Sequence, residues 1–297
     1  MIEEIESVGS ISRAELDARD RPLRIIGGAR AMRAVARWGP GDLAGRIGDV
    51  EIAFKLSANG KHPNFHAPTL AEAFARGRGT VREFLALITG GPREERARYL
   101  FTGDEQFLVK RRNGITETSP HLAALLEDLE VPAQISPDRL YTIWAWFSGP
   151  GVRTWTHYDN NACHNLNAQI TGTKTCLLFE PRQLARLAPF PLGGANPAYN
   201  CSQLDADTLP PEIPRITTRL EPGDLLFIPA WWLHAFHHLG DFNSNVNWWW
   251  KPAVPVENPV SRRQQLIDLV TAAGVKPSPG SAEAILLGKL DAAAIAD

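Results

Sequence analysis

The chain has 297 residues, 44% of them hydrophobic, which is enough to bury a sizeable core in one large domain or two small ones. A formal net charge of -2 and a pI near 6.5 leave no basic excess, which argues against a nucleic-acid partner. The three cysteines show no CxxC spacing, so they predict neither a disulfide framework nor a zinc knuckle and favour a reducing compartment. No apolar run is long enough to span a bilayer, and the acidic start MIEEIES lacks the apolar region of a signal peptide. We therefore expect a soluble, cytoplasmic protein without a membrane partner.

The first 130 residues predict a mixture of strands and helices. The expected strands are 22–28, 50–56 and 98–101, and the expected helices are 29–38, a short one after Pro40, 69–76, 80–89 and 120–129. Thr80 and Glu83 have the spacing of a capping box. Two histidines, His62 and His66, flank a Pro-Asn turn with no carboxylate nearby, which favours a solvated loop over a ligand pair.

From residue 140 the character of the chain becomes β. The expected strands are 140–148, 154–159, 164–171, 174–179, 215–219, 224–229, 232–238 and 242–250. Short strands separated by turns indicate an antiparallel sandwich or barrel, with 181–214 as a long excursion. Residues 262–273 and 281–293 look helical, so a C-terminal tail, 257–297, is expected after a main domain, 1–256, whose core is about 140–252.

One segment carries an obvious metal-binding pattern. His157 and Asp159 lie two residues apart, and on a strand such residues share one face at roughly 6.6 Å. A second imidazole would complete a facial triad of two histidines and one carboxylate with open coordination positions. The apolar strand after Pro222-Gly-Asp224 delivers His234, the preferred third ligand, while His237 and His238 are alternatives by residue type.

Side-chain alternation predicts a polar cavity. Asn165, Asn167 and Gln169 share one strand face, and a second polar row is formed by Asn243, Asn245, Asn247 and Trp249. Polar groups facing inward are costly unless they are satisfied, which favours a ligand-filled cavity over a dry core. Asn167 and Trp249 are therefore expected to contact substrate, and Trp146 is a further candidate. Trp144 and Trp146 share a face of another strand, where they either wall the cavity or serve as plain core aromatics.

Together these stretches resemble the JmjC, or cupin-like, family of Fe(II)- and 2-oxoglutarate-dependent oxygenases. The branch that looks most similar contains the asparaginyl hydroxylase that inhibits the hypoxia-inducible factor. The motifs are Thr154-Trp-Thr-His157-Tyr-Asp159, Asn165…Gln169-Ile-Thr-Gly172-Thr-Lys174, Pro222-Gly-Asp224…Ile228-Pro-Ala-Trp-Trp-Leu-His234 and Val246-Asn247-Trp-Trp249. The resemblance spans about 140–252 and implies a double-stranded β-helix, or jelly roll, with N-terminal α/β elements.

The resemblance also implies roles for individual residues. His157, Asp159 and His234 would hold Fe(II), while Asn165 and Asn247 would lie beside the metal-bound end of 2-oxoglutarate. Lys174 would bind the distal carboxylate, helped by Thr154 and by Tyr99. A buried lysine needs an anionic partner, which agrees with this role, although a surface lysine after a Thr-Gly turn is the alternative.

The expected reaction uses O2 to hydroxylate a C–H bond, releasing succinate and CO2. A peptide or protein side chain is the favoured substrate, with a small molecule as the alternative; a non-oxidative metal-dependent cupin is a further one. Residues Asn160–His164 contain two more residues than the family's usual spacing; Cys163 and His164 there could reach the site, but a loop tip is favoured. The C-terminal helices resemble a dimerising tail, so a homodimer is expected.

Overall fold

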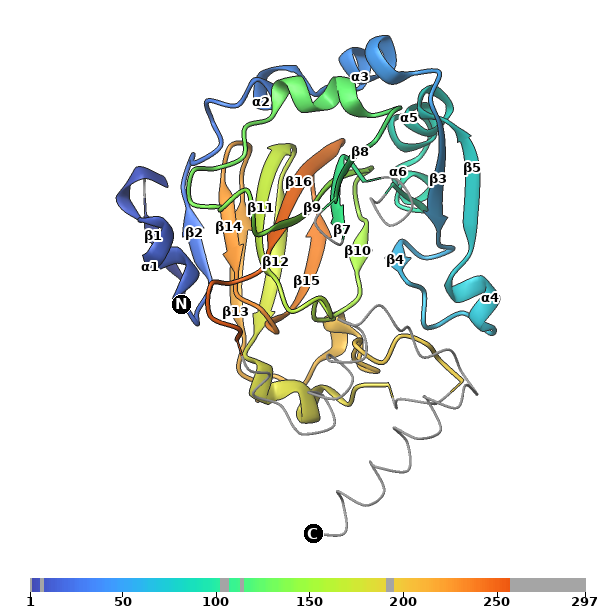
Figure 1. The fold of residues 1–297 in the computed structure, drawn as a ribbon. Coiled ribbons are helices and arrows are strands. Elements are labelled where there is room, and N and C mark those ends of the chain that lie inside the picture. The colour runs from blue at the N-terminus through green and yellow to red at the C-terminus, as the bar shows by residue number, and fades with distance from the viewer. Residues whose placement is uncertain (1, 6–7, 102–106, 113–114, 191–194, 257–297) are drawn as a thin grey trace.

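The computed structural model describes residues 2–5, 8–101, 107–112, 115–190 and 195–256, and these are mainly β. Two facing sheets form the centre of the molecule (Figure 1). The larger has the strand order β1-β2-β14-β11-β16-β9-β6-β3-β5, with a β7–β8 pair attached to β9, and the smaller has the order β13-β12-β15-β10-β4. The expected mainly β jelly-roll architecture is confirmed, while the expected helices at 262–273 and 281–293 lie outside the described residues.

The jelly roll is built from antiparallel strands after residue 139, four in each sheet. In the larger sheet they are β9 (Leu140–Ser148), β11 (His164–Thr171), β14 (Leu225–Ile228) and β16 (Asn243–Trp250). In the smaller sheet they are β10 (Arg153–Thr154), β12 (Lys174–Phe179), β13 (Ile216–Leu220) and β15 (Leu233–His238). Gly172 (φ 73°) and Gly223 (φ 92°) make the turns between β11 and β12 and between β13 and β14, in a backbone region that favours glycine.

The remaining elements extend the sheets or cover them. The other strands are β1 (Glu3–Ile5), β2 (Leu23–Ile25), β3 (Glu51–Leu56), β4 (Lys61–His62), β5 (Arg76–Thr80), β6 (Tyr99–Phe101), β7 (Val109–Arg112) and β8 (Ile115–Thr118). The α-helices are α1 (Arg13–Asp17), α2 (Arg33–Arg37), α3 (Pro40–Ile47), α4 (Leu70–Ala73), α5 (Val81–Thr89) and α6 (Arg93–Arg96). The 3-10 helices are η1 (Val8–Ser10), η2 (Ala123–Asp128), η3 (Pro181–Leu187) and η4 (Ala206–Thr208).

Several local expectations are wrong. The helix expected at 120–129 is the 3-10 helix η2, and the one expected at 69–76 is the single turn α4 followed by strand β5. Strand β5 reads Arg-Gly-Arg-Gly-Thr and lies at the sheet edge, so it has no apolar alternation that would reveal it. Strands β1, β4, β7 and β8 were also not expected. The capping box at the start of α5 is confirmed, with Thr80 and Glu83 bonded reciprocally.

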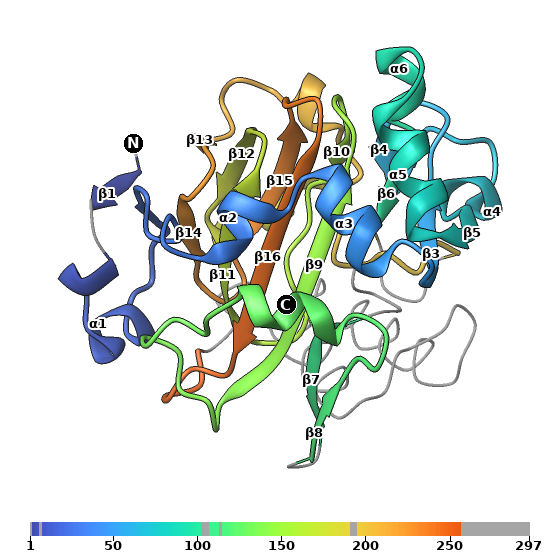
Figure 2. The same ribbon diagram turned by 90° about the horizontal axis from the view of Figure 1, so that it is seen from above.

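The larger sheet separates an apolar core from a polar interior. Val246, Trp248 and Trp250 of β16 pack outward against a cluster that includes residues of α2, α3 and α5. Figure 2 shows α2 and α3 crossing over one end of the barrel. The alternate residues of β16 face the smaller sheet, which is why all eight residues of this strand are buried although four of them are polar.

Candidate metal centre

A cavity of about 440 Å³ lies between the two sheets. The larger sheet contributes side chains from β9, β11 and β16, and the smaller sheet contributes side chains from β10, β12 and β15. The lining residues used below are Trp144, Trp146, Thr154, His157, Asp159, Asn165, Asn167, Lys174, His234, His238, Asn247 and Trp249. The polar rows expected on β11 and β16 therefore meet in one place, with two exceptions. The amide of Gln169 turns away to donate to the carbonyls of Thr171 and Gly172, and that of Asn243 donates to the carbonyl of Gly240.

The three residues of the expected triad come together at one end of this cavity. His157, Asp159 and His234 each offer a ligand atom, and these atoms all lie within 4.8 Å of one another. The backbones of His157 and His234 are joined by reciprocal hydrogen bonds of 3.0 and 2.7 Å. The segment 154–159 is not the continuous strand that was expected: β10 ends at Thr154, and His157 is held by isolated bridges to His234 and Cys201. Backbone hydrogen bonds between segments distant in the sequence therefore position the ligand pair.

Both histidine rings are oriented for metal binding through Nε2. His157 Nδ1 lies 2.7 Å from the carbonyl oxygen of Trp155, and His234 Nδ1 lies 3.1 Å from that of Trp232. Because a carbonyl only accepts, each Nδ1 carries the hydrogen and each Nε2 keeps its lone pair. Burial and the neighbouring His234 lower the pKa of His157 to about 4, so the imidazole is neutral near pH 7.

Asp159 is prepared as a ligand through one oxygen. Its Oδ2 accepts hydrogen bonds from Trp249 Nε1 at 2.7 Å and from Asn165 Nδ2 at 3.0 Å. Its Oδ1 lies 3.9 Å from His157 Nε2. Two neutral imidazoles and one carboxylate oxygen fit a divalent transition metal such as Fe(II). Trp249, expected as a substrate contact, therefore also orients a ligand.

A chain of side-chain amides runs from the triad to Lys174. Lys174 Nζ donates to Asn167 Oδ1 at 2.8 Å, and Asn167 Nδ2 donates to Asn247 Oδ1 at 3.1 Å. Asn247 Nδ2 then donates to Asn165 Oδ1 at 2.8 Å, and Asn165 Nδ2 donates to Asp159. Asn245 adds a 2.8 Å bond to Asn247 Oδ1. Asn167, expected to touch substrate, lines the cavity, is 1% exposed and holds the lysine.

Lys174 is a buried cation in need of an anion. It is 1% exposed, and no described carboxylate lies within ion-pair distance of its Nζ, which sits 4.3 Å from the centre of the Phe236 ring. Burial lowers the pKa of Lys174 to about 7. An anionic ligand would raise that pKa again by stabilising the charged form. Thr154 lines the same cavity and accepts from the Phe236 backbone, which leaves its hydroxyl hydrogen free to donate.

The structure does not bring Tyr99 to the cavity. Its ring packs edge-on against Phe54, 6.0 Å away, and lines a separate hollow. The next residue, Leu100, lines the cavity instead, because neighbouring residues of a strand face opposite ways. Trp146 does line the cavity, as does Trp144. The ring centre of Trp144 lies 6.1 Å from that of Trp146 and 4.9 Å from that of Trp249.

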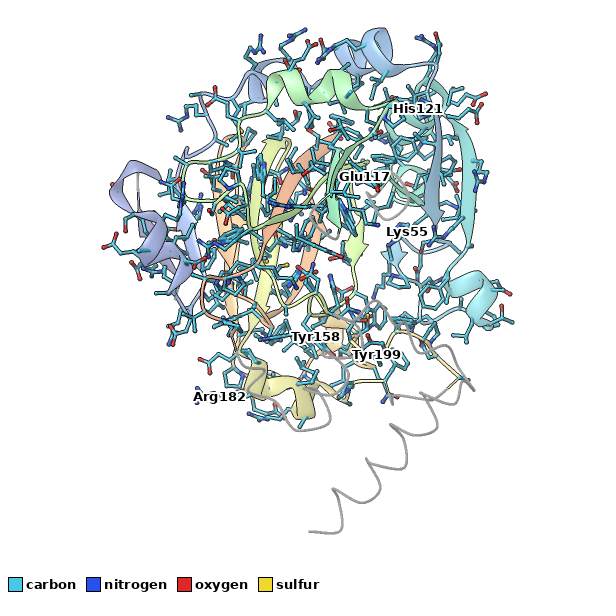
Figure 3. The ribbon with its side chains drawn as sticks, in the orientation of Figure 1. Lys55, Glu117, His121, Tyr158, Arg182 and Tyr199 are labelled. Carbon is cyan, nitrogen blue, oxygen red and sulfur yellow. The ribbon has the colours of Figure 1, made fainter. Side chains whose placement is uncertain are left out.

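Residues 157–161 and 195–201 form the rim at the triad end. Asn160 donates to the Tyr199 hydroxyl at 3.1 Å, and Asn200 exchanges bonds with the Tyr158 backbone; Figure 3 labels Tyr158 and Tyr199 near this end of the barrel. The expected loop tip at Cys163 and His164 is wrong. Both are buried, and His164 begins β11 with its ring bonded to the backbone of Ala230 and Asp17. Only Asn160 and Asn161 of the insertion line the cavity.

Sequence reasoning missed further cavity residues. His62 was expected in a solvated loop, but it is 4% exposed because β4 pairs with β10 beside Thr154. His238 also lines the cavity, as does Lys55 of β3, labelled in Figure 3. For His238 a signal existed, since it shares a strand face with His234. For His62 and Lys55 none did, because pairing between distant segments brings them in.

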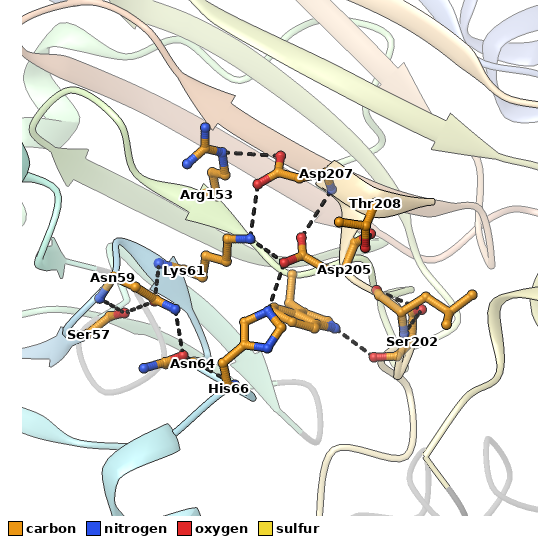
Figure 4. Close-up of polar contacts among 12 residues, drawn as sticks. Ser57, Asn59, Lys61, Asn64, His66, Arg153, Ser202, Asp205, Asp207 and Thr208 are labelled. Carbon is orange, nitrogen blue, oxygen red and sulfur yellow. Dashed lines mark hydrogen bonds and ion pairs between the residues drawn. The ribbon is translucent and has the colours of Figure 1, made fainter. Parts of the chain in front are cut away.

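Beside the cavity, an ion-pair network ties the 59–66 loop to the segment around η4 (Figure 4). Asp205 accepts from Lys61 and, at 2.8 Å, from His66 Nε2. Asp207 lies 3.0 Å from Lys61 and 3.4 Å from Arg153, the residue before Thr154. The network therefore holds a cavity wall from outside.

Two general expectations can be compared with the described chain. Cys163, Cys176 and Cys201 are all buried and free, as expected from their spacing. Among the described residues, no helix combines the length and the apolar character needed to cross a bilayer.

Comparison with known proteins places the chain in a family. A model of the cupin-like domain matches residues 10–254. The chain is 28% identical to tRNA wybutosine-synthesizing protein 5 of Danio rerio over 228 residues, which cover 73% of this chain and 65% of that protein. It is 32% identical to tRNA wybutosine-synthesizing protein 4 of Gibberella zeae over 172 residues (57% and 16%) and 29% identical to Lysine-specific demethylase 8 of Xenopus tropicalis over 162 residues (49% and 35%). The chain thus spans less than two thirds of the length of each of these relatives. The match to most of its length shows that this chain belongs to the cupin-like domain family.

Proposed function

We propose that this protein is an Fe(II)- and 2-oxoglutarate-dependent dioxygenase of the JmjC type that hydroxylates a C–H bond. One observation carries the proposal. A three-residue metal-ligand set and a buried lysine without a described anionic partner share one cavity and are joined by a chain of hydrogen-bonded amides. A metal site and an anion site at opposite ends of such a chain suit a chelating 2-oxo acid with a distal carboxylate.

The proposed roles follow from the donor atoms. His157, Asp159 and His234 would hold Fe(II), with positions left open because the described residues supply three ligands at this site. Lys174 and Thr154 would bind the distal carboxylate of 2-oxoglutarate. When bound, Fe(II), 2-oxoglutarate and O2 supply the oxidative chemistry, with succinate and CO2 as by-products. The work of the chain itself is binding, orientation and exclusion of water.

Asn165 and Trp249 orient the metal carboxylate, and Asn167 orients the lysine, so neither charged group depends on bulk water for its position. Trp144, Trp146 and Trp249 wall the larger-sheet side of the cavity with apolar surface. In such an environment, charge interactions are stronger than in water, which favours a bound dicarboxylate and a fixed metal ligand.

For the substrate we propose a neutral side chain of a peptide or protein, as in the asparaginyl hydroxylase branch. Asp159 is the only acidic residue among the described residues that line the cavity, and in this proposal it binds the metal. The wall therefore offers no carboxylate to a basic side chain, although one of the relatives is a lysine-specific demethylase by name. A volume of about 440 Å³ also suits a small molecule, so a small-molecule hydroxylase is the second candidate.

The proposal includes a cytoplasmic location, supported by the three cysteines that form no disulfide. It does not include a nucleic-acid substrate, because the chain has no basic excess, even though the names of two relatives refer to tRNA.

The test is the formation of succinate from 2-oxoglutarate by the full chain with Fe(II) and ascorbate, together with the thermal shift caused by N-oxalylglycine. Turnover and a shift to a higher Tm support an oxygenase. The absence of both would leave a non-oxidative cupin enzyme as the better reading. Screening peptides and metabolites for a mass gain of one oxygen would then separate the two substrate candidates.

A further inference from the structure

His238 lies directly opposite Lys174 at the end of the cavity remote from the triad. The two residues are partners in the β12–β15 ladder. The Leu239 amide donates to the Thr173 carbonyl at 2.8 Å, which makes the adjacent Lys174–His238 pair a non-hydrogen-bonded one. In such pairs the Cα atoms are only about 4.5 Å apart and the side chains lie close together. Lys174 is 1% exposed and His238 is 3% exposed, and both line the cavity.

The ring of His238 is held at one nitrogen and available at the other. Its Nδ1 contacts the Ser148 hydroxyl at 2.5 Å, whereas its Nε2 has no hydrogen-bond partner among the residues that the structure describes. Because a hydroxyl can donate to Nδ1, the ring can carry its hydrogen on Nε2. Burial and the charge of Lys174 lower the pKa of His238, so the imidazole is neutral and has one N–H to give.

The surroundings at this end suit an anion. The carboxylate of Asp159 is attached to the other end of the amide chain, and no other described acidic residue lines the cavity. Lys174 donates one hydrogen bond to Asn167, and its ammonium group has two further hydrogens to donate. A tyrosine, which the family resemblance suggested for this position, is missing here, since Tyr99 lines a different hollow. A carboxylate has two oxygens and can accept several hydrogen bonds, so a further donor beside Lys174 and Thr154 would strengthen its binding.

We propose that His238, held by Ser148, donates its Nε2 hydrogen to the distal carboxylate of 2-oxoglutarate alongside Lys174. This inference rests on the proposed function and adds a binding residue to it. It makes His238 a determinant of cosubstrate choice, because a 2-oxo acid without the distal carboxylate gains nothing from the histidine.

The test compares 2-oxoglutarate with 2-oxopentanoate, which has the same chain length and no distal carboxylate, by calorimetric titration of the Mn(II)-loaded full chain. His238→Leu should weaken 2-oxoglutarate binding by at least about tenfold, the usual worth of a hydrogen bond to a charged group. The same variant should leave 2-oxopentanoate binding unchanged. His238→Gln keeps an N–H donor and should retain most of the affinity. His237→Leu is the matched control: it is next on the same strand, does not line the cavity and should behave as the wild type.

The outcomes separate the two levels of the proposal. If the wild type does not bind 2-oxoglutarate, the proposed function is wrong. If the wild type binds it and His238→Leu binds it equally well, only the role of His238 is wrong. An equal loss for both 2-oxo acids would mean that the histidine is merely structural, and that also overturns the inference. Should His238→Leu fail to fold, Ser148→Ala provides a second variant, with a smaller loss confined to 2-oxoglutarate expected and no change counting against the proposal.

Discussion

Lys174 Nζ donates to Asn167 Oδ1 at 2.8 Å, and this bond sets the direction of the amide chain that follows it. An ammonium can only donate, and the carboxylate of Asp159 at the far end can only accept. Each amide between them must therefore present its oxygen toward the lysine and its nitrogen toward the aspartate. These hydrogen-bonded amides connect the anion site to the metal site, and no proton has to be transferred along them.

Replacing Asn167 should separate affinity for 2-oxoglutarate from affinity for the metal. Asn167→Asp places a carboxylate beside Lys174, which satisfies the lysine internally and competes with the cosubstrate. We expect the KM for 2-oxoglutarate to rise about tenfold or more, with little change in metal affinity. Asn167→Leu should raise the KM by a smaller factor, because the lysine loses its position but not its need for an anion. Steady-state kinetics with 2-oxoglutarate as the varied substrate measure both, and a lower KM in Asn167→Asp would contradict this role.

Removing the lysine should affect the cosubstrate and not the metal. Lys174→Ala deletes the buried cation proposed to bind the distal carboxylate, so the concentration of 2-oxoglutarate needed for half-maximal rate should rise by about 100-fold. Metal content after dialysis should match that of the wild type. Loss of the metal in this variant would contradict the proposed roles.

The triad variants should show the reverse pattern. His157→Ala and Asp159→Ala each remove one of three ligand atoms, and we expect neither variant to retain Fe(II) or Mn(II). Titration with Mn(II) followed by electron paramagnetic resonance measures this. His66→Ala serves as control, because that histidine is bonded to Asp205 and does not line the cavity.

Trp249→Phe should weaken metal binding although Trp249 is not a ligand. Phenylalanine keeps an aromatic wall but cannot donate to Asp159 Oδ2, which then keeps Asn165 as its one donor among the described residues. Loss of such an orienting bond costs about 10-fold or more in metal affinity. Trp144→Phe, a neighbouring wall residue, is the control. If only substrate affinity changes in Trp249→Phe, the tryptophan serves substrate binding alone.

Asp205 should make folding stability sensitive to acid. Burial by itself raises the pKa of Asp205, but the hydrogen bonds from Lys61, His66 and the Asp207 backbone outweigh it and lower the pKa to about 2. Because the folded-state value lies below the ordinary 3.8, the stabilisation is present above about pH 4 and is lost as the pH falls toward 2.

Asp205→Asn should therefore lower the free energy of unfolding by about 2 kcal/mol at pH 7, with a smaller deficit at pH 3. Urea denaturation at the two pH values measures the difference. Asp207→Asn is the control: its side chain is 43% exposed, and its loss should cost less than about 1 kcal/mol. A deficit in Asp205→Asn that does not change between pH 7 and pH 3 would contradict the assignment.

Local patterns were sufficient for much of the candidate site. The alternation of β11 and β16 indicated a polar inner face, and the structure brings Asn165, Asn167 and Asn247 onto it. The His-x-Asp pair and His234 meet as the motifs suggested, although the segment around His157 is not a regular strand. The motif spacing still predicts the site because backbone hydrogen bonds between distant segments hold the ligands in place.

Other residues could be placed only by pairing between distant segments. The local sequence does not show whether Tyr99 or Leu100 faces the cavity. Only the pairing of β6 with β3 and β9 decides it. His62 is buried because β4 pairs with β10. Each of these strands has only two residues, which is too short for a strand pattern to show in the sequence.

The sequence by itself determined the mainly β class, the ligand types and the polar faces, because these depend on side-chain chemistry and on the two-residue period of a strand. Only the tertiary structure decided that Lys174 faces Asn167 and His238, that Trp249 orients Asp159, and that Tyr99 is excluded. The physical reason is register: which residues oppose each other across a ladder depends on where strands far apart in the chain align, and a shift of one position would turn each of these side chains to the other face.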